Sequence, residues 1–204
     1  MTRRRSILAL CAAVPSAAAT GRPAQAAAVA VLRDGSLSFT GHATVGDFVG
    51  TTSTVTGEVA ADPDLASVRG WVEAPVATLR TGNGRRDRDL RAVMDAAAYP
   101  TIRFELAGAA ARGPLGAAGV PALLRGTLRV HGVAREVSVP ATVARVADTV
   151  RVAGGFPLDV SDYQVRGLSK MFGLLKMREV VDVRLALRFV VARPHPAPST
   201  RSTP

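Results

Sequence analysis

The strongest constraint on the fold is a two-residue alternation of apolar and polar side chains that recurs along most of the chain. It is clearest near the C-terminus, where every second residue from Val181 to Phe189 is apolar. Successive side chains of a β-strand point to opposite faces, so this segment is predicted to be a strand with one buried face. Similar segments lie near residues 36–41, 48–60, 68–76, 101–106, 127–131, 136–143 and 149–156.

These segments predict an antiparallel sheet. About eight strands with one apolar face each must gather those faces around a single interior. A parallel sheet would need a helical crossover between successive strands, and only one helix-like insertion is visible in the sequence. A two-sheet sandwich and a closed barrel both satisfy the pattern, although closure also removes exposed strand edges.

The clearest departure from the alternation is residues 81–104, where a Gly- and Asn-rich turn leads into a charged segment. Asn83 or Asp87 can cap a helix there, and Pro100 prevents the helix from continuing. Four apolar residues fall at helical spacing: Leu90, Val93, Met94 and Ala97. We therefore expect one short inserted helix, with an apolar stripe on the sheet and an arginine-rich face toward solvent.

The first 26 residues have the features of a secretory signal peptide. Arginines at positions 3–5 precede a short apolar run, and Ala24-Gln25-Ala26 forms a cleavage site. The paired arginines also fit a twin-arginine signal, so the export route stays open. Residues 192–204 are rich in Pro, Ser and Thr and are predicted to be a disordered tail. We expect one domain over residues 27–191, exported to the periplasm or secreted.

Charge and cysteine content narrow the function further. The chain carries a net charge of +10, of which four charges are leader arginines, so the mature part carries +6. Its only cysteine, Cys11, lies in the leader, which excludes disulfides and thiol chemistry in the mature protein. No nucleic-acid-binding motif is present. The positive charge is compatible with peripheral contact with an anionic membrane surface.

The sequence contains no pattern typical of a metal centre or a catalytic site. His42, His131 and His195 are far apart and belong to no metal-binding motif. The G-x-S-x-G turn of serine hydrolases is absent, and residues 81–84 lack the G-K-[ST] ending of a phosphate loop. We therefore expect no enzyme activity, no metal and no cofactor other than a bound lipid.

Four blocks of the sequence resemble the YceI-like family of exported lipid-binding proteins. They cover residues 38–57, 79–104, 125–139 and 156–180. The second block is the most specific: L-R-T-G-N at 79–83 is followed by R-D at 86–87, L-R at 90–91 and Y-P at 99–100. The order and spacing of the blocks carry the resemblance more than any single motif does.

The resemblance implies a lipocalin-like, closed antiparallel β-barrel with an inserted helix. It also implies a long apolar ligand inside the barrel, such as a polyisoprenoid, an isoprenoid quinone or a fatty-acyl chain, held for transport, storage or stress protection. The chain departs from the family where aromatic residues are common, at Met94 and residues 96–98. Pocket shape and ligand identity therefore do not carry over.

Candidate ligand contacts are the apolar residues expected on the inner face, on the helix and in the segment after residue 170. For each of them, packing in a solid core is an equally good interpretation. We also expect residues 171–177 to form part of a mouth or lid, with a buried strand or loop as the alternative. The candidates are Phe39, Val72, Val76, Leu90, Met94, Ile102, Phe104, Leu128, Val130, Phe156, Leu158, Met171, Phe172, Leu174, Leu175 and Met177.

The arginines of the inserted helix allow two interpretations. Arg86 and Arg91 can receive an anionic head group, because guanidinium groups match phosphate geometry. The alternative is a solvated helix face, with Asp87 pairing an arginine to fix the turn. A second function follows from the same face: a barrel packed solid, which binds an envelope or protein partner through its arginines. The sequence leaves the oligomeric state open.

Overall fold

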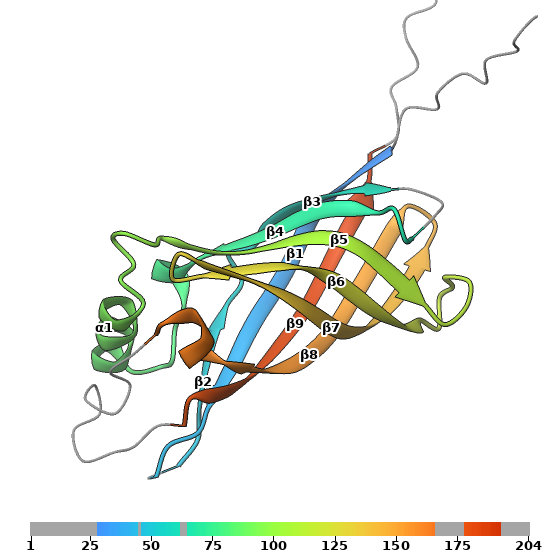
Figure 1. Cartoon of the computed structure of the whole chain (residues 1–204). Helices are drawn as coiled ribbons and strands as arrows, with labels where there is room; N and C mark the ends of the chain where they lie inside the picture. The colour runs from blue at the N-terminus through green and yellow to red at the C-terminus, as the bar shows by residue number, and fades with distance from the viewer. Residues whose placement is uncertain (1–27, 45, 62–64, 166–177, 193–204) are drawn as a thin grey trace, which may run out of the picture.

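The computed structural model describes residues 28–44, 46–61, 65–165 and 178–192, and within them nine strands and one α-helix (Figure 1). The strands are β1 (Ala28–Gly41), β2 (Phe48–Thr52), β3 (Thr56–Ala61), β4 (Arg69–Pro75), β5 (Thr101–Ala111), β6 (Val120–Val130), β7 (Val133–Val146), β8 (Thr149–Asp159) and β9 (Val180–Val191). The helices are α1 (Gly84–Val93) and two short 3-10 helices, η1 (Val76–Thr78) and η2 (Val160–Tyr163).

The sheet closes on itself because β1 pairs with strands on both of its edges. One edge pairs with β9, while the other pairs with β3 near Ala28 and with β2 near Gly41. From β3 to β9 each strand pairs with the next, and all pairs are antiparallel. Eight strands therefore form a closed barrel to which β2 is added, which confirms the predicted fold class and excludes the sandwich. The single strand expected over residues 48–60 is divided into β2 and β3.

The alternation in sequence becomes an inward and an outward register. On β6, Ala122, Leu128 and Val130 are buried, whereas Arg125 and Arg129 are exposed. Gly126 also occupies the inward register, and there the Phe104 ring of β5 crosses it. A Cβ at this position would lie 2.7 Å from the ring and 2.2 Å from the carbonyl oxygen of Glu105. Glycine thus makes room for an aromatic side chain inside the barrel.

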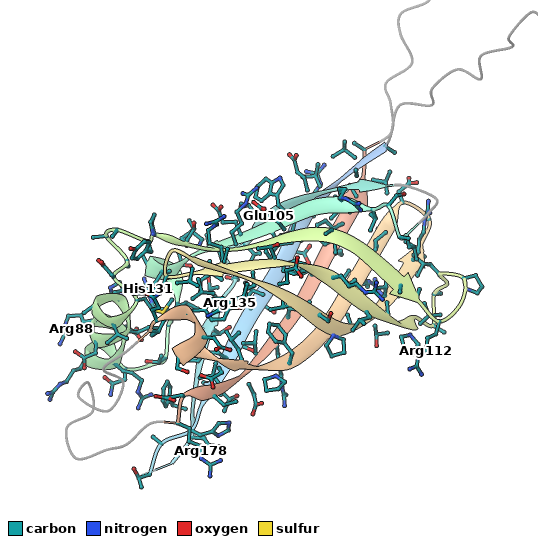
Figure 2. All side chains as sticks on the ribbon, viewed as in Figure 1. Arg88, Glu105, Arg112, His131, Arg135 and Arg178 are labelled. Atoms are coloured by element: carbon teal, nitrogen blue, oxygen red, sulfur yellow. The ribbon has the colours of Figure 1, made fainter. Side chains whose placement is uncertain are left out.

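The two ends of the barrel are built differently (Figure 1). At one end, here called the helix end, lie η1, α1, the β6–β7 turn and η2. At the opposite end, here called the loop end, lie residues 65–68, the β5–β6 loop at 112–119 and the β7–β8 turn at 147–148. Figure 2 shows the contrast through Arg88 on α1 and Arg112 on the β5–β6 loop, which lie at opposite ends.

Three local expectations are wrong. The inserted helix ends at Val93, and Ala97 is exposed rather than packed. The helix stops early because Asp95 adopts a positive φ of 41° and its carbonyl accepts hydrogen bonds from the N–H groups of Ala98 and Tyr99. Val76 belongs to η1 rather than to a strand. His131 lies in the β6–β7 turn with φ of 48°, not on the strand.

The predicted leader and tail lie outside the described residues, apart from Ala192. The backbone N–H of Ala192 donates to the carbonyl of Val29 at 2.8 Å, so the β1–β9 contact extends one residue past β9. The leader and tail stay predictions.

Candidate functional site

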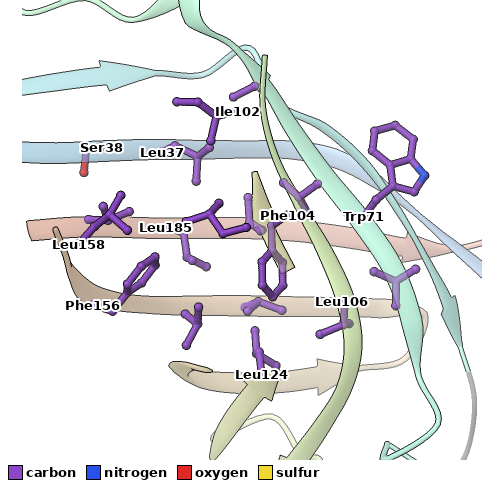
Figure 3. A pocket seen from close by; sticks show the side chains of 18 of the residues that line it. Leu37, Ser38, Trp71, Ile102, Phe104, Leu106, Leu124, Phe156, Leu158 and Leu185 are labelled. Carbon is purple, nitrogen blue, oxygen red and sulfur yellow. The ribbon is translucent and has the colours of Figure 1, made fainter. Parts of the chain in front are cut away.

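The barrel encloses an apolar cavity of about 310 Å³. Its walls come from the inward register of the strands and from α1, and Figure 3 shows Phe104, Leu124, Phe156 and Leu185 converging on it from different strands. Among the described lining residues, the polar ones are few: Ser38, Thr52, Trp71 and Arg145. Ligand pockets commonly measure about 300–1,000 Å³, so this cavity suits one slim ligand.

The cavity extends along the barrel from one end to the other. Leu90 and Met94 line it at the helix end, and Leu115 and Arg145 line it at the loop end. Strand β9 contributes to the wall from Val181 to Val191, which is about 33 Å of strand at 3.3 Å per residue. With the strand tilt of about 35–45° usual in barrels, this corresponds to about 25 Å along the barrel axis. The cavity is therefore long and narrow.

Apolar side chains pack closely at the helix end. Met94, Val130, Tyr163 and Val165 are all buried and belong to one cluster together with Val76. Tyr163 is 2% exposed, and its burial raises the pKa of the phenol. These side chains come from α1, β6 and the η2 region, so the cluster joins the helix to the barrel wall.

A capped turn holds α1 in place. The side-chain oxygen of Asn83 accepts hydrogen bonds from the backbone N–H groups of Arg85 at 3.0 Å and Arg86 at 3.1 Å. These are two of the N–H groups that have no partner within the first turn of a helix. Gly82, just before the cap, has a φ of 74°, which favours glycine. Of the two predicted caps, Asn83 therefore occupies the N-cap position.

Asp87 fixes the same turn from inside the helix. Its Oδ1 accepts the backbone N–H of Thr81 at 2.8 Å and the Thr81 hydroxyl at 2.6 Å. Asp87 is buried, and the hydroxyl of Thr81 is the main cause that holds its pKa below the ordinary value of 3.8. The expected pairing with an arginine is replaced by this bond to Thr81. The most specific block of the resemblance thus has a structural role, which is to position α1.

The predicted contact residues fall into three groups. Val76 is buried in the cluster with Met94 and does not line the cavity. Met171, Phe172, Leu174, Leu175 and Met177 lie outside the described residues, so the lid at 171–177 stays a prediction. The remaining ten line the cavity: Phe39, Val72, Leu90, Met94, Ile102, Phe104, Leu128, Val130, Phe156 and Leu158.

Sequence reasoning missed much of the loop-end wall. The inward residues of β8 and β9, among them Val152, Leu187 and Phe189, line the cavity but were not selected as contacts. Their alternation was visible in the sequence and could have identified them. Arg145 was also missed. It continues the inward register of Val139, Ala141 and Val143 on β7, where an arginine interrupts the apolar pattern.

The predicted head-group arginines lie on α1, and neither lines the cavity. The Arg86 guanidinium stacks on the Phe48 ring at 4.3 Å from the ring centre, a favourable cation–π geometry. Its Nε is buried and has no hydrogen-bond partner among the described residues. Arg91 is partly buried in the last turn of α1. Head-group binding by these two residues stays a prediction.

Two of the three histidines can be described. His42 lies between Asp47 and Asp182, with 3.0 Å from each ring nitrogen to a carboxylate oxygen. The hydrogen bond to Asp182, followed by that to Asp47, raises the pKa of His42 above 6.5. His131 Nδ1 lies 3.3 Å from the carbonyl oxygen of Tyr163. In the described part of the chain, no group of three or more His, Cys, Asp or Glu residues is arranged to hold a metal ion.

The described residues contain no helix long and apolar enough to cross a membrane.

Solved structures share this architecture at low sequence identity. BcnA from Burkholderia cenocepacia aligns with a TM-score of 0.65 and 22% identity, over 76% of this chain and 95% of that chain. A polyisoprenoid-binding domain from Saccharophagus degradans, implicated in plant cell wall breakdown, aligns with a TM-score of 0.68 and 17% identity, over 81% and 99%. A YCEI protein from Campylobacter jejuni aligns with a TM-score of 0.54 and 17% identity, over 71% and 85%.

Comparison with curated protein sequences gives no match. The model of the YceI-like domain, in contrast, matches residues 30–189, which reach from β1 to β9 and include the inserted helix. The predicted resemblance is therefore confirmed over most of the chain, and the chain belongs to the YceI-like family.

Proposed function

We propose that this protein is an exported, non-enzymatic carrier that encloses a long apolar lipid, such as a polyisoprenoid, an isoprenoid quinone or a fatty-acyl chain. The observation that carries the proposal is the apolar cavity that runs from Met94 to Leu115 through the barrel. Family membership and the polyisoprenoid-binding domain of similar fold support the ligand class. The proposed mechanism is encapsulation, in which the barrel wall excludes water from the lipid chain.

The cavity is costly to leave unfilled. The side chains around an empty cavity lose the contacts that a filled core would give them. Apolar cavities of this kind exclude water, and a lipid is the natural group to occupy one. Bound lipid should therefore raise the melting temperature of the barrel.

Contact energies favour a long chain over a small metabolite. Burial of one CH₂ group contributes about 0.8 kcal/mol, whereas association costs on the order of 4–15 kcal/mol. A ligand held mainly by apolar contact therefore needs well over about ten buried carbons to bind tightly. Fatty-acyl chains and polyprenols meet this condition, and a cavity that extends along the barrel provides the necessary length.

The alternative function, a solid barrel that binds a partner through its arginine-rich face, requires a filled interior. The continuous cavity argues against it. The positive surface remains compatible with a peripheral contact with anionic membrane, which a lipid carrier would use to exchange its cargo.

Native mass spectrometry of freshly purified protein tests the proposal. We expect a co-purifying lipid mass and, after delipidation, uptake of added polyprenol, quinone or fatty acid. Ala122 lines the cavity, so Ala122→Trp should place an indole inside it and reduce uptake at least tenfold. Ala186→Trp is the matched control, because Ala186 is exposed on the outward register of β9. An apo mass with no uptake, or equal uptake by both folded variants, would contradict the proposal.

A further inference from the structure

We propose that Arg145 is the head-group receptor of the barrel and that the lipid lies with an anionic carboxylate or phosphate at the loop end. This inference rests on the proposed function and specifies the ligand class and its direction. Arg145 is the one charged side chain among the described residues that line the cavity. It follows Val139, Ala141 and Val143 in the inward register of β7, at the point where the strand reaches the end of the barrel.

Hydrogen bonds from the backbone and from the side chain hold Arg145 on two sides. Its N–H donates to the carbonyl of Gly116 in the β5–β6 loop at 3.0 Å, and its Nε donates to the carbonyl of Ala147 in the β7–β8 turn at 3.3 Å. Within the described residues, the two terminal nitrogens of the guanidinium have no protein partner. The terminal N–H groups of Arg145 are therefore available to a ligand at the loop end of the cavity, while the surrounding loops fix the position of the residue.

Chemistry at this position favours an anion at the end of an apolar chain. The side chain is exposed, so the charge is hydrated and needs no partner within the protein. The wall next to it is apolar, with Leu115, Val150 and Val191 among its members. A chain buried against that wall would place its terminal group beside the guanidinium, which can bind a carboxylate or a phosphate through two parallel N–H donors.

The opposite orientation would use the helix end. There Met94, Val130 and Val165 are buried and apolar, and the described residues that line the cavity at that end carry no charge. Arg86 and Arg91 lie on α1 outside the cavity wall. Within the described part of the chain, a head group at that end would reach a cation only outside the cavity. The two orientations therefore predict sensitivity to different arginines.

Binding of three probes to the delipidated protein tests the inference: palmitate, hexadecyl phosphate and hexadecanol, which share a chain and differ in the head group. We expect Arg145→Gln to weaken palmitate and hexadecyl phosphate about three- to tenfold and to leave hexadecanol unchanged. Arg145→Lys should restore part of the loss. Arg112→Gln is the matched control, because Arg112 is exposed at the same end but does not line the cavity. A greater loss for one anion would distinguish carboxylate from phosphate.

The outcomes separate this inference from the proposed function. If wild-type protein binds all three probes and Ala122→Trp blocks them, encapsulation holds. An Arg145→Gln effect equal for all three probes, or absent, would then overturn the head-group role alone. A selective loss for the anions in Arg86→Gln/Arg91→Gln, with Arg145→Gln unaffected, would reverse the orientation. If no probe binds to the wild-type protein, both proposals fall.

Discussion

The helix end and the loop end of the barrel use polar residues in opposite ways. At the helix end, polar side chains bond to their own turn: Asn83 caps α1 and Asp87 binds Thr81. Apolar side chains, Met94 and Tyr163 among them, then form one buried cluster. At the loop end, Arg145 lines the cavity, and its Nε donates a hydrogen bond to the carbonyl of Ala147 in the next turn. The difference supports the proposal that the helix end serves stability and the loop end receives the head group of the ligand.

The largest expected effect comes from a matched pair of truncations, one at each end of the barrel. Met94→Ala removes a buried side chain from the helix end and should lower the free energy of unfolding by about 2–5 kcal/mol. Leu115→Ala at the loop end should cost less than half as much, because Leu115 is only partly buried. Urea denaturation of the two delipidated variants measures both values. Equal losses would show that the ends contribute alike to stability.

The bond between Asp87 and Thr81 gives a smaller effect of the same kind. Asp87→Ala leaves the N–H and O–H of Thr81 without their acceptor and should destabilise the protein by about 1–3 kcal/mol. Arg145→Ala at the loop end should change stability by less than about 0.5 kcal/mol, since it removes an exposed side chain. Thermal unfolding at neutral pH compares them, and a loss in Arg145→Ala as large as that in Asp87→Ala would reject the distinction.

Strong acid should reduce the effect of Asp87→Ala on stability. The folded-state pKa of Asp87 is lowered, so its contribution to stability is present above the ordinary value of 3.8 and is lost as the pH falls through the lowered pKa. The difference in stability between wild type and Asp87→Ala should therefore narrow in strong acid. A difference that stays constant down to that range would mean that the ionised form has no special role.

Loss of the helix cap should have a milder effect. Asn83→Ala removes the acceptor for two backbone N–H groups and should cost about 1 kcal/mol. Asn83→Asp, which keeps an acceptor, should retain most of the stability. Hydrogen exchange of the α1 amides would report the change locally, and unaltered protection in Asn83→Ala would show that packing alone holds the helix.

The smallest expected effect concerns His42, which joins the β1–β2 turn to the start of β9. Its pKa is raised by Asp182 and Asp47, so the stabilisation is complete below the ordinary value of 6.5 and disappears as the pH rises through the raised pKa. The melting temperature should fall slightly over that range in the wild type and stay flatter in His42→Gln. Identical pH profiles would show that the ion pairs of His42 do not contribute to stability.

The alternation and the one helical insertion were sufficient to predict an antiparallel sheet with a short helix, whereas closure into a barrel was predicted from the family resemblance. They placed Phe104, Leu128 and Phe156 on the inside, because a strand fixes the face of every second residue. The volume of the cavity could not be predicted from the sequence in the same way. It depends on which side chains meet across the interior, as where the Phe104 ring lies over Gly126. The early end of α1 was also hidden, since the positive φ of Asp95 has no signature in the spacing of apolar residues.

The site was predicted unevenly for a related reason. Residues on the middle of the strands were identified, whereas Arg145 was missed because the prediction followed apolar positions and stopped at Val143. When only hydrophobicity is considered, a charged residue on the inward face of a strand is taken for the end of that strand. Register pairing supplies the missing information, since Arg145 lies opposite Val150 of β8, which also lines the cavity.

A crystal structure of the delipidated protein saturated with palmitate tests the central claim most directly. The account predicts continuous density through the barrel between Met94 and Leu115, with the carboxylate beside Arg145 at the loop end. An interior that remains empty or collapses onto its own side chains, with palmitate on the outer surface or absent, would contradict the claim that this barrel encloses its ligand.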